Sequence, residues 1–311
     1  MRKAFVNTLV ELAAKDERVL LLTGDLGYTV LEPFIEKFPD RFFNVGVAEQ
    51  NMIGIATGLA ESGFIPFVYS IATFALLRPY EFIRNGPVLH KLAVRIIGLG
   101  GGFEYGPAGI THHALEDLGV TRLQPGMAVI APSDFQQARS ALLASWNLPG
   151  PVYYRLGKDE KTVIPGLQGK FELGKPQVIR EGTDLVILTC GGIACEAYAA
   201  TEILASKGIS TEVVLVSTLS PAPIKDLAGI LENFPLALTV EAHYTTGGIG
   251  SLVSEIIAEK NIPCRLVRCG VDSTKNVATG SQAYLHKKYN LSADALAKQV
   301  IQNLRMRRVN R

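Results

Sequence analysis

The chain has 311 residues, 48% of them hydrophobic, and its 31 lysines and arginines nearly balance 29 aspartates and glutamates. This length suggests about two domains, and the scattered charge gives no basic surface that would point to nucleic acid or a membrane. No apolar stretch approaches the ~20 residues of a membrane span and the N-terminus lacks the apolar core of a signal peptide, so we expect a cytoplasmic protein.

Apolar runs alternate with helical patterns along the whole chain, which is typical of an α/β fold with mostly parallel strands. In the first half, one helix is expected to begin at Glu49 and end before Gly63, and another to cover about residues 76–89. Either Ser133 or Asp134 is expected to cap the helix that follows it. The predicted strands of this half are residues 18–23, 42–45, 65–69, 94–99, 128–130 and 151–155.

The second half repeats this alternation after a stretch with glycines, prolines and little periodicity. The sequence therefore predicts a domain over residues 1–160, a linker over 161–175 and a second domain over 176–311. Both domains are expected to be layered α/β units that bind ligands at the carboxyl ends of their strands. Strands are expected near residues 185–189, 212–216, 237–241 and 265–268, with a last helix over about 292–304.

The cysteines all lie in this second half, at positions 190, 195, 264 and 269. They are too few for a disulfide scaffold, and their spacing does not match a metal-binding C-x-x-C pattern. We expect them to be reduced residues of the core.

One carboxylate stands out in the segment 46–52, which reads GVAEQNM. Glu49 begins a predicted helix directly after a predicted strand, in otherwise apolar surroundings. One interpretation is a first-turn glutamate that the helix dipole favours. The other is a buried acid that does hydrogen-bonding work at a functional site.

A glycine-rich loop follows the strand at 94–99: residues 100–113 read GGGFEYGPAGITHH, with five glycines and two adjacent histidines. Such glycine density allows a backbone to approach a ligand closely, but the spacing fits neither a P-loop nor a dinucleotide fingerprint. His112 and His113 point different ways and make a poor metal pair, so a proton-handling or substrate-orienting pair and a plain loop are the main alternatives. For His243, structural and functional interpretations both stay open.

These motifs, in this order, resemble the pyrimidine-binding domain of the transketolase family. The resemblance rests on Asp25, the GVAEQNM segment, residues 69–74 (YSIATF), Thr111-His112 and residues 132–134 (PSD). The second half resembles the transketolase C-terminal domain through residues 240–243 (VEAH) and 247–251 (GGIGS). The resemblance covers essentially the whole chain. It implies a thiamine-diphosphate-dependent transferase that moves a two-carbon ketol unit between sugars.

The family binds the diphosphate through a Gly-Asp-Gly sequence followed later by Asn, and this sequence contains no Gly-Asp-Gly. The nearest match is Gly24-Asp25-Leu26, which by the resemblance corresponds to a different element of the family. The resemblance therefore implies one half of a split enzyme. A separate partner subunit would hold the diphosphate and its Mg²⁺ (or Ca²⁺) ion, with no metal site in this chain. The resemblance also implies self-association through this chain and a heterotetramer with the partner.

The resemblance further implies roles for single residues. Glu49 matches the carboxyl group that hydrogen-bonds the aminopyrimidine and activates the cofactor, Phe74 the ring that stacks on it, and Asp25 a residue near the thiazolium. His112 matches the histidine that contacts substrate oxygens and assists proton transfer. Arg155 aligns with an arginine that binds the acceptor's phosphate, with a strand-end salt bridge as the alternative.

Two departures from the family pattern concern the substrate. Ala108 stands where transketolases usually carry an acid that reads the donor's hydroxyl stereochemistry, and residues 96–98 hold no counterpart of the phosphate-contacting histidine. Tyr105 and His113 are candidates for replacement contacts. We therefore expect small sugar or sugar-phosphate substrates, with an atypical donor or acceptor.

Two other functions remain as alternatives. The β subunit of a 2-oxo-acid dehydrogenase E1 component has a similar length, the same two domains and a matching glutamate, but Thr111-His112 followed by Glu116-Asp117 favours a transketolase. A non-catalytic binding or regulatory subunit would not need Glu49, Phe74 and His112 together. Deoxyxylulose-phosphate synthase shares the pyrimidine domain, but its chain also includes the diphosphate half.

Overall fold

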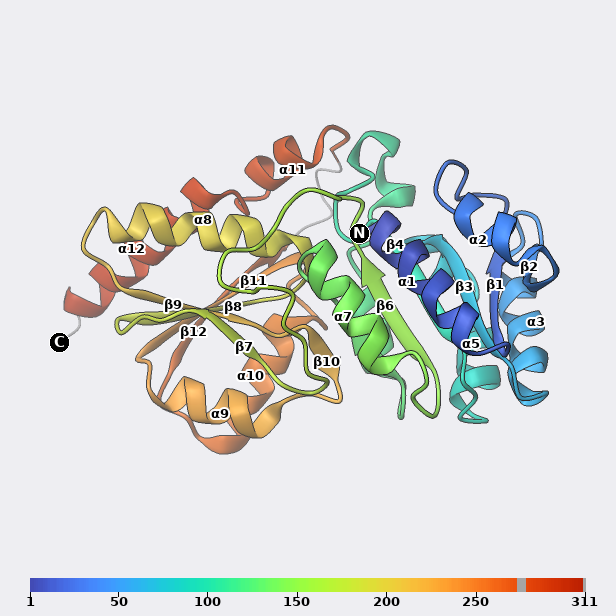
Figure 1. Ribbon diagram of the computed structural model, residues 1–311. Helices are drawn as coiled ribbons and strands as arrows, with labels where there is room; N and C mark the ends of the chain where they lie inside the picture. The colour runs from blue at the N-terminus through green and yellow to red at the C-terminus, as the bar shows by residue number, and fades with distance from the viewer. Residues whose placement is uncertain (273–277, 310–311) are drawn as a thin grey trace.

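The computed structural model describes residues 1–272 and 278–309, which form two sheets side by side (Figure 1). The first sheet has seven strands in the order β10-β5-β6-β4-β3-β1-β2, all parallel to their neighbours except β10. The bounds of these strands are β1 Val19–Thr23, β2 Phe42–Asn44, β3 Ile65–Ile71, β4 Arg95–Leu99, β5 Ala128–Ile130, β6 Val152–Leu156 and β10 Thr218–Ser220.

The strand β1 shows why such residues form a buried parallel sheet. All five of its side chains are buried, and successive side chains point to opposite faces. Leu21 packs with one layer of helices and Leu22 with the other, and the one polar side chain of the strand, Thr23, bonds its hydroxyl to backbone carbonyl oxygens. The first layer consists of α1 (Arg2–Lys15), α2 (Glu32–Lys37) and α7 (Phe135–Ser145), and the second includes α3 (Glu49–Glu61) and α4 (Ala72–Leu76).

The second sheet has five strands in the order β12-β11-β8-β9-β7, parallel except for β7. One face is covered by α8 (Ala194–Ala205) and α12 (Ala293–Val309), and the other by α9 (Ile224–Glu232) and α10 (Ile249–Lys260) (Figure 1). The bounds of the strands are β7 Gln177–Arg180, β8 Leu185–Thr189, β9 Thr211–Leu215, β11 Leu236–Tyr244 and β12 Arg265–Val271.

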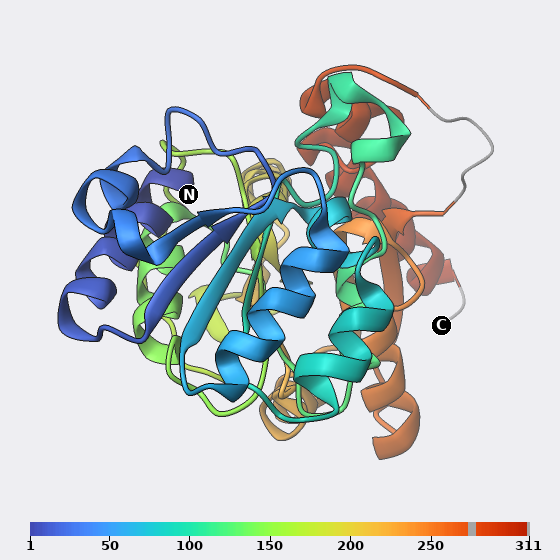
Figure 2. The same cartoon turned by 90° about the vertical axis from the view of Figure 1, so that its right-hand side faces the viewer.

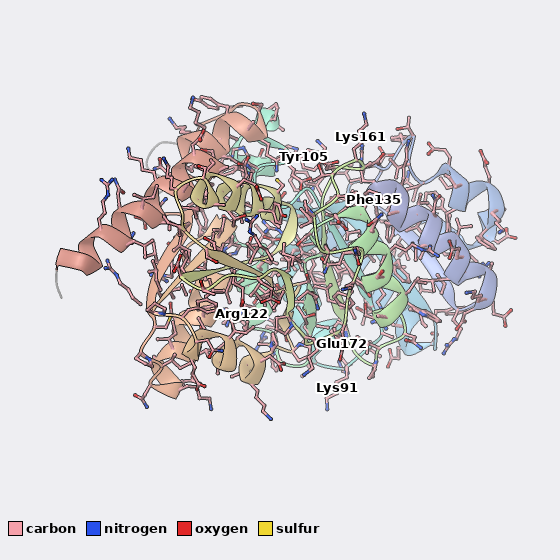
Figure 3. All side chains as sticks on the ribbon, turned by 60° about the vertical axis from the view of Figure 1, so that its left-hand side comes forward. Lys91, Tyr105, Arg122, Phe135, Lys161 and Glu172 are labelled. Atoms are coloured by element: carbon pink, nitrogen blue, oxygen red, sulfur yellow. The ribbon has the colours of Figure 1, made fainter. Side chains whose placement is uncertain are left out.

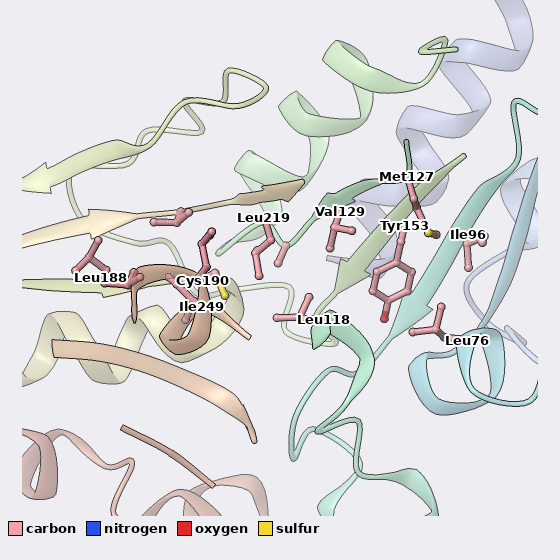
Figure 4. Close-up of a cluster of buried hydrophobic side chains, with 14 of the residues drawn as sticks. Leu76, Ile96, Leu118, Met127, Val129, Tyr153, Leu188, Cys190, Leu219 and Ile249 are labelled. Carbon is pink, nitrogen blue, oxygen red and sulfur yellow. The ribbon is translucent and has the colours of Figure 1, made fainter. Parts of the chain in front are cut away.

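The two domains share one hydrophobic core. Leu118 and Tyr153 of the first half belong to the same cluster of buried side chains as Leu188 of the second half (Figure 4). The strand β10, although it lies in the second half of the sequence, pairs antiparallel with β5, with Thr218 opposite Ile130. The second domain therefore completes the first sheet and is not a separate body on a linker.

A buried ion pair lies at this junction. The side chain of Arg155 is 5% exposed, and its Nε lies 3.0 Å from Oδ2 of Asp117. Its Nη2 donates to the carbonyl oxygens of Ala114, at 2.7 Å, and of Ala242 in β11, at 2.8 Å. The hydroxyl of Tyr153 donates to Oδ2 of Asp117 at 2.7 Å. The acceptors of one guanidinium thus come from both domains, which holds the two sheets in one relative position.

The predicted strands are all present, and the capping prediction is confirmed at one of its two residues. The backbone amide of Gln137 donates to Oδ1 of Asp134 at 2.8 Å, so Asp134 caps α7. Two strands, β7 and β10, and the first two helices, α1 and α2, have no counterpart in the predictions.

The single helix predicted over residues 76–89 is wrong. The chain forms α4, then the short α5 (Tyr80–Ile83), then a π-helical turn (Arg84–Val88). Pro79 and Pro87 account for the difference, because a proline has no N–H to continue the helix and its ring clashes with the preceding turn. The break places Arg78 at the corner between α4 and α5.

Replacing Arg155 with Met should destabilise the chain by about 3–5 kcal/mol, because Asp117 would stay behind as an unpaired buried charge. Equilibrium unfolding in denaturant measures this loss. The double variant Arg155→Met/Asp117→Asn removes both charges and should recover part of the stability. An Arg155→Met chain within about 0.5 kcal/mol of the wild type would show that the pair contributes nothing to holding the domains together.

Candidate functional site

Four of the predicted site residues lie where neighbouring strands of the first sheet end. Asp25 follows β1, Glu49 follows β2, Phe74 follows β3, and His112 lies in the loop after β4. Since these strands are adjacent and parallel, their carboxyl ends meet at one edge of the sheet. In Figure 2 the loop of residues 100–113 lies at the top of the molecule beside α11 (Gln282–Lys288).

Glu49 is the buried acid of this edge. It is the first residue of α3 and is 2% exposed. The hydroxyl of Ser70, in β3, donates to its Oε1 at 3.1 Å, and Nη1 of Arg78 donates to its Oε2 at 2.8 Å. Gly24 lies beside it, where an added Cβ would be in contact with Oε1 at 3.5 Å. A buried carboxylate with two specific donors supports the functional interpretation of Glu49 over that of a solvated first-turn residue.

Aromatic and cationic groups surround this acid. The guanidinium carbon of Arg78 lies 3.9 Å from the ring centroid of Phe74. The ring of His112 meets Phe74 edge-on at 4.9 Å, and the ring of Tyr105 lies 6.2 Å from that of His112. Nδ1 of His112 is within hydrogen-bond distance of the hydroxyl of Thr111, at 2.9 Å. The structure therefore brings Glu49, Phe74, His112 and Tyr105 into one cluster.

Arg78 is the member of this cluster that the sequence analysis missed. Its signal is weak: a single arginine four residues after Phe74, directly before Pro79. A continuous helix, as predicted there, gives no reason for that arginine to turn back toward Glu49. The corner between α4 and α5 provides the reason.

Asp25 is exposed at the same edge. Its backbone has a positive φ of 56°, and its carboxylate accepts from the hydroxyl of Tyr28 at 2.7 Å and from the side-chain amide of Asn44 at 3.0 Å. The hydrogen bonds from Asn44 and Tyr28 lower the pKa of Asp25. The residue is therefore held as an oriented carboxylate beside Gly24 and the Glu49 region.

Arg155 and His113, two candidate substrate contacts, have their polar groups engaged inside the chain. Arg155 forms the buried ion pair with Asp117, which is the salt-bridge alternative of the sequence analysis, and its guanidinium is engaged at the domain junction. His113 is 5% exposed, with Nε2 3.2 Å from the carbonyl oxygen of Gly106 and its ring edge-on to Phe103. Both side chains thus have structural roles in this arrangement.

The glycines of the loop after β4 serve close packing within the chain. An added Cβ at Gly101 would lie 2.0 Å from Nε of Arg155, and one at Gly102 would lie 2.6 Å from Cβ of Ala242. At Gly106 it would lie 2.4 Å from the carbonyl oxygen of Gly280. These glycines therefore allow the loop to approach Arg155 and the second domain closely. The sequence analysis expected the loop to approach a ligand instead.

His243 joins the two domains. Its Nε2 accepts from the backbone amide of Gly119 at 3.1 Å, and its Nδ1 lies 2.7 Å from the carbonyl oxygen of Tyr244, a pattern that fits one neutral tautomer. Burial lowers the pKa of His243. Arg122, labelled in Figure 3, donates Nη1 to the carbonyl oxygen of Gly247 at 2.6 Å. These contacts tie α6 (Asp117–Arg122) to the turn after β11 and support the structural interpretation of His243.

The remaining motif of the second domain is a helix cap. Glu241 accepts from the backbone amides of Ile249, at 2.9 Å, and Gly250, at 3.0 Å, at the start of α10. Burial raises the pKa of Glu241 to about 7. A Cβ at Gly248 would lie 1.9 Å from Oε2 of Glu241, so a side chain there would displace the carboxylate that caps α10.

Three further features complete the description of the site. In the part of the chain that the structure describes, no three His, Cys, Asp or Glu side chains gather as a metal ion would need. Among the helices of residues 1–272 and 278–309, none is both long and apolar enough to cross a membrane. Cys190, Cys264 and Cys269 are buried as expected, whereas Cys195 is exposed in α8, so the core prediction is wrong for that residue.

Comparison with known proteins places the chain among transketolases. The family model of the transketolase pyrimidine-binding domain matches residues 1–162, and that of the transketolase C-terminal domain matches residues 174–296. A putative transketolase C-terminal section from Methanocaldococcus jannaschii is 37% identical over 308 residues, covering 98% of this chain and 96% of that protein. A 6-deoxy-6-sulfo-D-fructose transketolase subunit from Clostridium sp. is 35% identical, covering 96% of this chain and 92% of that protein.

A solved structure is similar over the same extent. It is a split-gene transketolase described as an inactive β4 tetramer, with a TM-score of 0.85, 34% sequence identity and coverage of 97% of this chain and 96% of that one. Relatives and structure agree with the α/β fold of two domains with mostly parallel sheets that the sequence predicted. The chain belongs to the transketolase family and corresponds to the C-terminal section of a split transketolase.

Proposed function

We propose that this chain binds the aminopyrimidine of thiamine diphosphate, and that the assembled enzyme transfers a two-carbon ketol unit between sugars. The observation that carries the proposal is Glu49, a carboxylate only 2% exposed at the carboxyl edge of a parallel sheet. A carboxyl group in this position can form a hydrogen bond with a ring nitrogen. Arg78 contacts both Glu49 and Phe74, and the ring of Phe74 in turn contacts that of His112.

The residues present fit an aminopyrimidine, and the contacts of Arg78 support this fit. Its guanidinium is flat, carries N–H donors, lies on the face of Phe74 and donates to Glu49. It stands in for a flat nitrogen heterocycle that would stack on the same ring and face the same carboxylate oxygen.

Each side chain of the cluster has a task in this proposal. Thiamine diphosphate, when bound, supplies the carbon nucleophile that carries the ketol unit. Glu49 would share a proton with the pyrimidine nitrogen, while Ser70 keeps its other oxygen oriented. His112, with Nδ1 beside the Thr111 hydroxyl, would bind a substrate oxygen and move a proton through its other nitrogen. We assign Tyr105 to the substrate side and Asp25 to the cofactor side of the cluster.

We further propose that a separate subunit holds the diphosphate and a Mg²⁺ or Ca²⁺ ion, in a cytoplasmic heterotetramer in which two copies of this chain pair. The similar split-gene structure, described as an inactive β4 tetramer, supports both self-association and the need for a partner. The helix α3 also exposes Gly54, Ile55 and Gly58 on the side away from its core, which is a flat face that a second copy can cover.

The purified chain, given thiamine diphosphate and Mg²⁺, should show no ketol transfer, because this proposal places the diphosphate site on another subunit. Activity should appear when a subunit that carries the Gly-Asp-Gly sequence is added. A coupled assay of ketol transfer before and after mixing measures this. Full turnover by the chain alone would refute the division of the active site.

The variant Glu49→Gln should slow exchange of the thiazolium C2 proton by about 100-fold or more in the assembled enzyme, since an amide cannot share a proton as the acid does. Proton exchange followed by NMR measures this rate. Glu61→Gln, at the exposed far end of the same helix, is the matched control and should exchange at the wild-type rate. A folded Glu49→Gln enzyme with wild-type exchange would sink the assignment.

Two features of the loop and its surroundings concern substrate choice. Ala108 is exposed and offers no carboxylate to a donor hydroxyl, and the guanidinium of Arg155 is enclosed in the domain junction. We therefore propose an atypical sugar substrate, such as a deoxy, modified or unphosphorylated one. The Clostridium relative, a 6-deoxy-6-sulfo-D-fructose transketolase subunit, supports this choice.

The assembled enzyme should prefer xylulose 5-phosphate and ribose 5-phosphate over non-phosphorylated counterparts by less than about tenfold in kcat/KM. A charged hydrogen bond to phosphate contributes about 1.5–3 kcal/mol, or roughly 10–150-fold, which this site does not provide through Arg155. Ala108→Asp restores the family's acid and should sharpen selection among donor stereoisomers. Ordinary transketolase preference for the phosphorylated pair in the wild type would contradict the proposal.

A further inference from the structure

Arg78 combines two contacts that the proposed function assigns to the cofactor. Its Nη1 donates to Oε2 of Glu49 at 2.8 Å, and its guanidinium carbon lies 3.9 Å from the centroid of Phe74. The first is the carboxylate oxygen that would face a pyrimidine nitrogen, and the second is the ring on which that pyrimidine would stack. One flat cation thus occupies both positions at once.

The two contacts exclude a second flat group in the same place. An aromatic ring stacked on Phe74 needs the face that the guanidinium now covers, and its donor needs the oxygen that Nη1 now uses. Oε1 of Glu49 is already bonded to the hydroxyl of Ser70. Arg78 must therefore leave before an aminopyrimidine can enter.

The side chain of Arg78 is also free to move away from this position. Its side chain is 44% exposed, whereas that of Glu49 is 2% exposed. It lies at the corner between α4 and α5, followed by Pro79, and not within a continuous helix. A half-exposed arginine has rotamers that reach water, so it can give up the ion pair without moving the backbone.

We propose that Arg78 is a placeholder for the aminopyrimidine: it pairs with Glu49 and covers Phe74 in the cofactor-free subunit, and cofactor binding displaces it. This inference rests on the proposed function. Its effect is to keep a buried carboxylate paired until the cofactor binds, since an uncompensated buried charge is strongly destabilising. Cofactor affinity is then lowered by the contacts that have to be broken, so Arg78 is a positioning residue that sets this affinity.

The test compares complexes of the partner subunit with wild-type, Arg78→Met and Arg84→Met chains. Methionine keeps much of the length and removes the charge. Arg84 is an exposed arginine of the neighbouring π-helical turn, bonded to Asn85, and serves as the matched control. Thiamine diphosphate with Mg²⁺ is titrated calorimetrically, and its association rate is measured by stopped flow. These readouts do not depend on turnover.

Arg78→Met should bind thiamine diphosphate about 3- to 10-fold more tightly than the wild type. The variant lacks the ion pair with Glu49 and the cation–π contact with Phe74, which in the wild type compete with the cofactor. Association should be faster, and Arg84→Met should match the wild type. Arg78→Lys keeps the charge without the flat fork and should fall between wild type and Arg78→Met. In the free chain, a double-mutant cycle with Glu49→Gln should show that Arg78 and Glu49 are coupled in thermal stability.

Unchanged or weaker binding by Arg78→Met would overturn the inference and would mean that Arg78 stays in place or contacts the cofactor. Absence of coupling in the cycle would overturn it as well. The results distinguish the two proposals, because a wild-type complex that does not bind thiamine diphosphate would overturn the proposed function and this inference together. If C2 exchange is slow in Glu49→Gln but Arg78→Met binds thiamine diphosphate as the wild type does, the proposed function stands and only the placeholder role of Arg78 is overturned.

Discussion

A charged guanidinium buried between two sheets constrains this whole molecule. Arg155 can stay inside only while Asp117 neutralises it and while carbonyl oxygens of both domains accept its hydrogens. That requirement fixes how the domains meet. It also fixes the loop after β4, because Gly101 lies against the guanidinium and Gly102 against Ala242. The same loop carries Tyr105 and His112, so the position of the candidate site depends on a charge that is buried at the domain junction.

The side chains of the candidate site become more exposed to solvent from Glu49 outward, as expected for one half of an active site between two chains. Glu49 is buried and held by Ser70, whereas Phe74 and His112 are half-buried and Arg78 lies partly in solvent. The side chain that needs low polarity is already enclosed by this chain. The groups that would contact cofactor and substrate lie at the edge of the sheet, where the proposed partner subunit would exclude water. This gradient matches the chain's place as one section of a split transketolase.

The sequence predicted those parts of the fold that hydrophobic pattern alone determines. A run such as VLLLT in β1 is diagnostic because both of its faces are covered, and the strand ends then bring Asp25, Glu49 and Phe74 to one edge. Long-range features were not predictable in this way. The strand β10 has three residues and pairs with a distant partner, and the break after α4 comes from prolines within an otherwise helical pattern. Whether an arginine such as Arg155 points inward depends on carbonyl groups that no local pattern reveals.

The antiparallel strand β10 has a consequence for synthesis on the ribosome. The first sheet is complete through β6 at Leu156, but the edge of β5 stays uncovered until Thr218–Ser220 have been made. At about 5–20 residues per second, the roughly 60 intervening residues leave that edge open for several seconds or more. An unpaired edge is a template for pairing with another nascent chain, so polysomes translating this message carry a transient aggregation hazard. Any nonsense mutation between these positions would make that hazard permanent.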